Sequence, residues 1–242
     1  KTNQDPHSYE LTARDQLLIN NADIVIMNGG GYDDFIQQAI DADPTPAITV
    51  DAFMASGDDL TRNEHIWYDV DQVGDVAAVI GAAIESVDES KFEEVEKRVA
   101  DFRAQLAKRK AKLDENKAML LVAYVTREQL SVFLTEPLAA YLVEDAGYID
   151  ATPKEFSDAV EEDRDVPPAV MKESTDLIKR GGVGAIFLNS NTQTTQMVNL
   201  INVNPDIPVF GFGELLIQDP ETLQYDGGYF EMLDAAIKTV IR

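Results

Sequence analysis

Both histidines of this chain lie in short motifs whose side chains could bind a metal ion. Imidazole is the commonest protein ligand for metal ions, and a nearby carboxylate or carbonyl usually fixes its direction. Each histidine has carboxylates close by in the sequence: Asp5 and Glu10 beside His7, and Glu64 and Asp69 beside His65. The other interpretation, two ordinary surface or hydrogen-bonded histidines, stays open on the motifs alone.

The rest of the composition limits which ligands a metal site could use. The chain has no cysteine, which excludes thiolate zinc sites, iron–sulfur clusters, disulfides and cysteine nucleophiles. A metal ion would therefore be held by nitrogen and oxygen atoms, and such ligands suit zinc, manganese or iron(II). The 44 acidic and 20 basic residues give a formal net charge of −24, which attracts cations and repels the phosphates of nucleic acids. We therefore expect no nucleic-acid partner.

The length of 242 residues allows one large domain or two small lobes with a buried core. The longest apolar run, residues 118–125, is far shorter than the roughly 18 residues that a membrane-spanning helix needs. No signal segment opens the chain, so we expect either a cytosolic protein or one whose targeting segment has been removed.

Short β-branched runs alternate with amphipathic segments along the chain, which is the pattern of a parallel α/β layer. The sequence predicts strands at 23–27, 47–50, 131–134, 185–188 and 208–210. It predicts helices that open near 12 and 167, and helices over 33–40, 73–87, 138–145, 153–162 and 229–241. The glycines at 29–31 follow the first strand without the spacing of a nucleotide-binding loop, so they predict a tight strand-to-helix turn.

One segment, 91–117, predicts an unusually long helix. It contains no glycine or proline, and apolar residues recur at three- and four-residue spacing from Phe92 to Leu106. At 1.5 Å per residue, its roughly 27 residues would form a rod about 40 Å long, enough to lie along two lobes. A coiled-coil dimer is the competing interpretation, but the regular positions are too few to favour it. Whether 119–125 continues this helix or forms a strand stays open.

With these elements in order, the chain resembles the zinc- and manganese-binding solute receptors of bacterial ABC transporters, the cluster A-I family. The run D-P-H-S-Y-E at 5–10 resembles the first ligand motif of that family, and N-E-H-I-W-Y-D at 63–69 is similar to the second, N-P-H-x-W-x-D. The resemblance implies an α/β fold of two lobes, each a mostly parallel sheet flanked by helices, joined by one long rigid helix. The lobes would span 1–90 and 118–242, with the helix at 91–117.

The resemblance also implies four metal ligands, two from each lobe. His7 and His65 would come from the first lobe, and Glu136, after the strand at 131–134, matches the glutamate version of the third ligand. Glu214 follows the last strand and is the candidate for the fourth ligand, with Asp219 as the alternative. Two carboxylates would neutralise a divalent ion, and we expect zinc to bind more tightly than manganese in vitro.

Other residues would orient these ligands. Asp5 and Asp69 are candidate acceptors for the imidazole N–H groups, and Asn189 is a candidate donor outside the ligand shell. Trp67 is expected to pack beneath the second motif.

The chain departs from the family pattern in three respects. Family members carry a longer segment before the first motif, so the amino-terminal lobe is expected to lack its first strand and helix. The histidine-rich loop of many zinc importers has no counterpart in this sequence. Glu64 replaces the usual proline beside His65, which adds a negative charge near the site.

The function implied by the resemblance is a non-catalytic, monomeric receptor that delivers zinc or manganese to an ABC-type membrane permease. It would be extracytoplasmic, either periplasmic or lipid-anchored at the cell surface. Four protein ligands would leave no position for a catalytic water, so we expect no enzymatic activity. The alternatives are a metal-dependent hydrolase, for which the chain lacks a His-Glu-x-x-His motif, and a surface adhesin with a structural metal.

Overall fold

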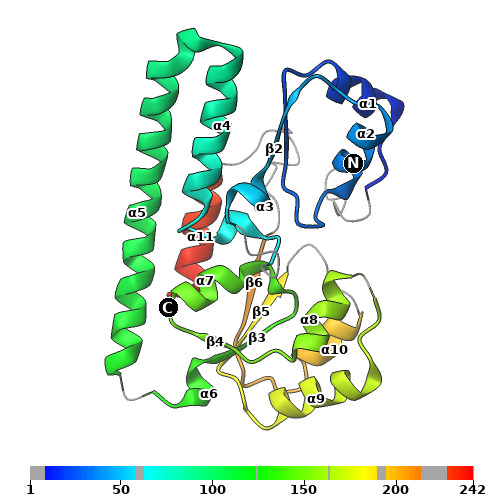
Figure 1. The fold of residues 1–242 in the computed structure, drawn as a ribbon. Coiled ribbons are helices and arrows are strands. Elements are labelled where there is room, and N and C mark those ends of the chain that lie inside the picture. The colour runs from blue at the N-terminus through cyan, green and yellow to red at the C-terminus, as the bar shows by residue number, and fades with distance from the viewer. Residues whose placement is uncertain are drawn as a thin grey trace, which may run out of the picture. The chain divides into compact units, whose positions relative to one another are not determined.

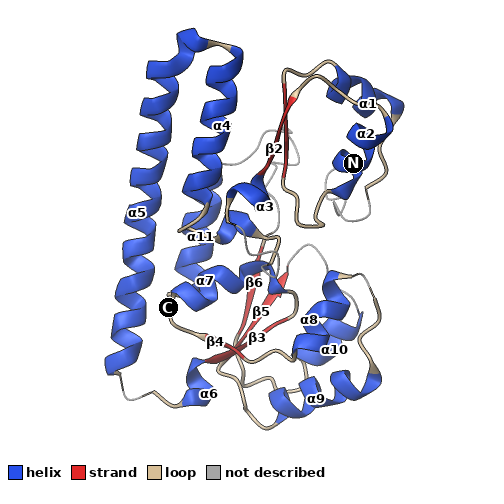
Figure 2. Cartoon of the chain, in the orientation of Figure 1, coloured by secondary structure: helices blue, strands red, loops and turns tan. Residues whose placement is uncertain are grey.

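The structure of the protein, a computed structural model, describes residues 9–57, 63–123, 125–162, 164–189, 195–213 and 228–241. The chain divides into two compact units, residues 1–108 and 109–242. Both are rich in helices and contain only short strands (Figures 1 and 2). No helix among the described residues is long and apolar enough to cross a membrane.

The first unit is built on a parallel pair of strands. Its elements before the long helix are α1 (Ala13–Asn20), β1 (Ile24–Met27), α2 (Asp34–Ala42), β2 (Ile48–Asp51), α3 (Ala52–Ala55), the 3-10 helix η2 (Ile66–Tyr68), α4 (Val73–Val87) and the 3-10 helix η3 (Glu89–Lys91). Strands β1 and β2 pair in parallel, with Ile24 opposite Ile48 and Met27 opposite Asp51. Both strands therefore end at the same edge, which places the turn after Met27 beside Asp51.

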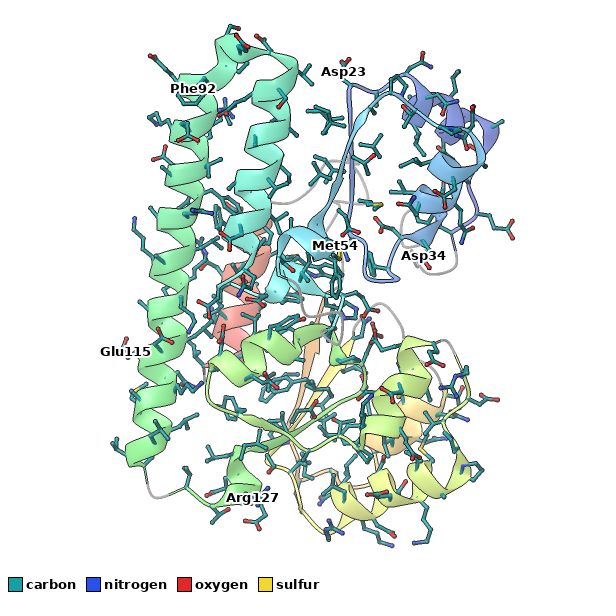
Figure 3. All side chains as sticks on the ribbon, in the orientation of Figure 1. Asp23, Asp34, Met54, Phe92, Glu115 and Arg127 are labelled. Atoms are coloured by element: carbon teal, nitrogen blue, oxygen red, sulfur yellow. The ribbon has the colours of Figure 1, made fainter. Side chains whose placement is uncertain are left out.

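The core of this unit forms where α3, η2 and α4 meet. Phe53, Ile66 and Val76 pack together there and are almost fully buried. The long helix α5 (Phe92–Val122) packs its first half along α4, and side chains fill the space between the two helices (Figure 3). The Arg103 guanidinium donates to the Gly74 carbonyl at 3.0 Å and so fastens α5 to α4.

The second unit contains a four-stranded parallel sheet in the order β4-β3-β5-β6. Its elements after α5 are α6 (Arg127–Leu130), β3 (Ser131–Leu134), η4 (Pro137–Ala139), α7 (Ala140–Asp145), β4 (Ile149–Asp150), α8 (Lys154–Glu161), α9 (Pro168–Lys179), β5 (Ala185–Asn189), α10 (Thr195–Ile201), β6 (Val209–Phe212) and α11 (Tyr229–Val240). Helices lie on both sides of this sheet (Figure 1).

The central strand β3 is buried at all four of its positions, as expected for a parallel strand covered on both faces. The Phe133 ring packs edge-on against Phe156 of α8, with 5.0 Å between ring centroids. The second half of α5 joins this unit through Arg109, which pairs with Asp234 at 2.6 Å and lies over the Phe230 ring.

The α/β class, the parallel pairing and the long helix are confirmed. The five predicted strands and the shorter predicted helices are present within one or two residues of their expected ends. The long helix, predicted over 91–117, continues to Val122. The open question about 119–125 is settled up to Val122, which is the last residue of α5. Among the described residues, the short elements α3, α6, β4 and α10 and the 3-10 helices η2 and η3 were not predicted, because none of them is long enough to show a regular apolar spacing.

Two glycines in left-handed turns of the second unit offer a test of how closely α5 packs against the rest of that unit. A β-carbon at Gly147 (φ +96°) would lie 3.0 Å from the Lys117 backbone, whereas one at Gly181 (φ +68°) would meet nothing within 4 Å. We expect Gly181→Ala to lower the free energy of unfolding by about 1 kcal/mol, from backbone strain alone. Gly147→Ala should lower it further because it adds a steric clash. Urea denaturation compares the two variants, and equal losses would contradict the close packing of α5 at Gly147.

The Asp150 carboxyl predicts a pH dependence of stability. Burial raises its pKa, and the hydrogen bonds from Thr152 oppose that rise only in part. A folded-state pKa above the unfolded value means that stability is greatest in acid and falls as pH rises through the raised pKa. Asp150→Asn keeps an oxygen for the Thr152 amide and removes the buried charge. We expect the stability advantage of this variant to grow from about pH 4 to pH 7, in urea melts at each pH. A constant difference across that range would contradict the prediction.

Candidate metal centre

His65 is fully buried and lies directly before η2. The side-chain oxygen of Asn63 accepts its backbone N–H at 2.7 Å and lies 2.6 Å from its ring Nδ1. Because an amide oxygen only accepts hydrogen bonds, this contact favours the neutral tautomer with the ring proton on Nδ1, which leaves the lone pair on Nε2. The local structure therefore prepares Nε2, the nitrogen farther from the backbone, as a ligand atom.

The glycine turn after β1, residues 28–33, contacts the loop that carries His65. Asn28 donates from its side chain to the Glu64 carbonyl at 2.9 Å. Gly30 has a φ of +68°, and a β-carbon there would lie 2.8 Å from the Phe53 ring and 3.0 Å from the Glu64 side chain. Asp33 closes the turn by accepting the Asn28 amide N–H at 2.7 Å. The predicted tight turn is confirmed, and it holds the residue before His65.

Two aromatic rings fix the plane of the His65 imidazole. Trp67 meets it edge-on with 5.1 Å between centroids, and Tyr32 does so at 6.0 Å. The expected packing role of Trp67 is thus confirmed. Asp69, expected as an acceptor for an imidazole, uses Oδ1 to accept the backbone amides of Asp71 and Gln72 ahead of α4. The acceptor seen at the imidazole, Asn63, was not predicted from the sequence.

His7 lies outside the described residues, but the chain just after it is anchored. The Tyr9 hydroxyl donates to the Asp15 carboxylate at 2.9 Å, and the Tyr9 ring packs against Phe35 of α2 at 5.0 Å. Hydrogen bonds from Thr12, and then from Tyr9, hold the pKa of Asp15 below its usual value. The end of the first motif is therefore fastened to both α1 and α2.

In the second unit, Glu136 follows β3 and opens the 3-10 helix η4. Asn189, the last residue of β5, donates from its side-chain amide to Glu136 Oε2 at 2.8 Å. The Asn189 backbone N–H lies 3.3 Å from the Thr135 hydroxyl oxygen, and both residues are only 2% exposed. The hydrogen bond expected from Asn189 is therefore present. It arises because β3 and β5 are neighbours whose carboxyl ends coincide.

The fourth candidate, Glu214, and its alternative, Asp219, lie outside the described residues. The chain is described up to Gly213, directly after β6. In the sheet register, Phe212 of β6 is the partner of Asn189. The structure thus brings Asn63 to His65 in one unit and Asn189 to Glu136 in the other, and the complete set of four ligands stays a prediction.

The sequence matches the family described as zinc-uptake complex component A, periplasmic (ZnuA), over residues 1–242. The chain belongs to this family. No curated protein matches the sequence.

Solved structures with the fold of this ZnuA-family chain include several metal-binding proteins. The periplasmic zinc-binding protein TroA from Treponema pallidum has a TM-score of 0.77 at 19% identity, covering 99% of this chain and 87% of TroA. The solute-binding protein FpvC from Pseudomonas aeruginosa, in complex with Mn²⁺, has a TM-score of 0.78 at 20% identity, covering 100% and 86%. The laminin-binding protein Lmb of Streptococcus agalactiae has a TM-score of 0.75 at 18% identity, covering 97% and 85%.

At identities of 18–20%, the solved structures establish only the fold of this chain. The sequence match over residues 1–242 establishes that it belongs to the ZnuA family. The resemblance to metal-binding solute receptors is confirmed. The family and these neighbours are binding proteins for divalent metals.

The hydrogen bond between Asn63 and His65 gives a prediction about tautomers. With only two histidines, nitrogen NMR of metal-free protein labelled at histidine can assign each ring. We expect His65 in the Nδ1–H form at neutral pH, and a mixture of tautomers in Asn63→Ala. Asn21→Ala, which removes an exposed amide of similar size, should leave the His65 signals unchanged. An Nε2–H form in the unsubstituted protein would contradict this geometry.

Proposed function

We propose that this protein is an extracytoplasmic receptor that binds one divalent transition metal ion and delivers it to an ABC-type membrane permease. The observation that best supports the proposal is the buried His65 ring, whose Nδ1 is held by Asn63 so that Nε2 keeps its lone pair. Family membership supports the same role, because the family is described by periplasmic zinc uptake. The cargo would be zinc or manganese.

The proposed ligands are His7 and His65 from the first unit and Glu136 and Glu214 from the second, with Asp219 as the alternative to Glu214. Two neutral imidazoles and two carboxylates would balance the charge of a divalent ion. Ligands of open parallel sheets bind outside the carboxyl ends of the strands. Glu136 follows β3 at such an end, and Glu214 comes two residues after β6 in the sequence.

The proposal includes the organisation expected from the sequence, with lobes at 1–90 and 118–242 and a rigid linking helix at 91–117. Continuous helical structure from Phe92 to Val122 supports the linking role. The protein would act as a monomer in the periplasm or at the cell surface, where the permease is its partner.

Two other functions are less well supported. A metal-dependent hydrolase needs a coordination position open to water, and four protein ligands would fill a tetrahedral site. A surface adhesin has a precedent in Lmb, which is described as a bifunctional protein with adhesin and metal-transporting activity. Because the family itself is described by zinc uptake, we adopt the transport role.

Metal loading tests the proposal. After treatment with EDTA and reloading with equal zinc and manganese, elemental analysis should find about one tightly held ion per chain. His65→Ala and Glu136→Ala should each abolish stoichiometric retention, because each removes one of four ligand atoms.

The strongly acidic surface calls for a control, since carboxylates can hold cations loosely. Glu115→Ala removes an exposed carboxylate of α5 and should retain the ion. Full retention of one ion by His65→Ala would contradict the proposed ligand set. Failure of the unsubstituted protein to retain any ion would contradict the receptor function.

A further inference from the structure

The two carboxylate oxygens of Glu136 are in unequal environments. Oε2 accepts a hydrogen bond from the Asn189 side-chain amide at 2.8 Å. An oxygen that accepts a strong hydrogen bond shares its electron density with the donor, so a metal ion gains less from it than from the other oxygen. A metal ion that binds Glu136 would therefore bind mainly through Oε1.

Asn189 cannot easily turn away from Glu136. It is the last residue of β5, and its side chain is buried. Its backbone N–H points to the Thr135 hydroxyl, and its partner across the sheet is Phe212 of β6. Thr135 is itself held, because its N–H donates to the Phe187 carbonyl at 2.9 Å. The sheet fixes the donor, so the inequality of the two oxygens is built into the fold.

The number of ligand atoms affects which metal is preferred. Zinc is satisfied by four nitrogen or oxygen ligands in a tetrahedron, whereas manganese favours a larger number of oxygens, which bidentate carboxylates can supply. His65 offers one nitrogen, fixed by Asn63. If Glu136 binds through one oxygen only, the number of ligand atoms around the ion stays close to the four that zinc prefers.

We infer that Asn189 is a specificity-determining residue, which keeps Glu136 monodentate and so favours zinc over manganese. The inference rests on the proposed function, because it requires Glu136 to be a metal ligand. Asn189 acts on the ion through Glu136 and is a positioning residue.

Competition between zinc and manganese for the metal-free full chain tests the inference. Replacing a partner outside the ligand shell typically changes metal affinity by 10- to 100-fold. We expect Asn189→Ala to lower the ratio of zinc affinity to manganese affinity by about 10-fold. Asn116→Ala is the matched control, since Asn116 is also a buried asparagine of the second unit and donates its side-chain amide to the Ala146 carbonyl at 2.8 Å. Its ratio should equal that of the unsubstituted protein.

A second measurement does not depend on how the variants fold. X-ray absorption of the zinc-loaded, unsubstituted protein should show about four nitrogen or oxygen neighbours at roughly 2.0–2.2 Å. Six neighbours would overturn the inference, because the two histidines and a bidentate fourth ligand supply at most four donor atoms and Glu136 would then have to supply two. So would an unchanged affinity ratio in Asn189→Ala, or an equal shift in Asn116→Ala, while metal binding itself continued. Absence of binding in the unsubstituted protein would instead overturn the proposed function, and this inference with it.

Discussion

A polar side chain removed from water needs a hydrogen-bond partner, and this requirement organises the residues around His65 and Glu136, the two candidate ligands that the structure describes. In this protein the partner is repeatedly an asparagine: Asn28 directly follows β1, Asn189 ends β5, and Asn63 lies between α3 and η2. Asn63 accepts from the His65 ring, and Asn189 donates to the Glu136 carboxylate. Asn28 donates to the carbonyl that precedes His65. The amide group can donate and accept at once, so one residue type serves all three positions.

The choice of amides also has an electrostatic consequence. The chain carries a formal net charge of −24. Each further carboxylate near the site would therefore add to the electrostatic repulsion among the negative charges of the protein. An aspartate in place of Asn63 would orient the imidazole equally well, and it would also stabilise a proton on Nε2, which competes with a metal ion. The neutral side-chain oxygen of Asn63 accepts the Nδ1 proton of His65 without stabilising a second proton on Nε2.

Much of the fold could be predicted because apolar residues recur at the spacing of strands and helices. The pattern left 119–125 undecided between helix and strand. Leu121 and Val122 in that segment are apolar and yet 81% exposed, so their hydrophobicity does not indicate burial. The two-residue strand β4 depends on its pairing with β3, which no local pattern records. At the site, the motifs drew attention to His65 and Glu136. Asn63 was missed because carboxylates were expected as the orienting groups, and only the folded loop shows which neighbour reaches the ring.

The boundary between the two compact units falls between Lys108 and Arg109, inside α5. A loop at such a boundary could change direction by rotating a few backbone dihedrals, but the interior of a helix can do so only by breaking its own hydrogen bonds. The helix is also clamped on each side, by Arg103 at Gly74 and by Arg109 at Asp234. A change of chain direction at this boundary would therefore have to strain the helix itself, because no loop lies there.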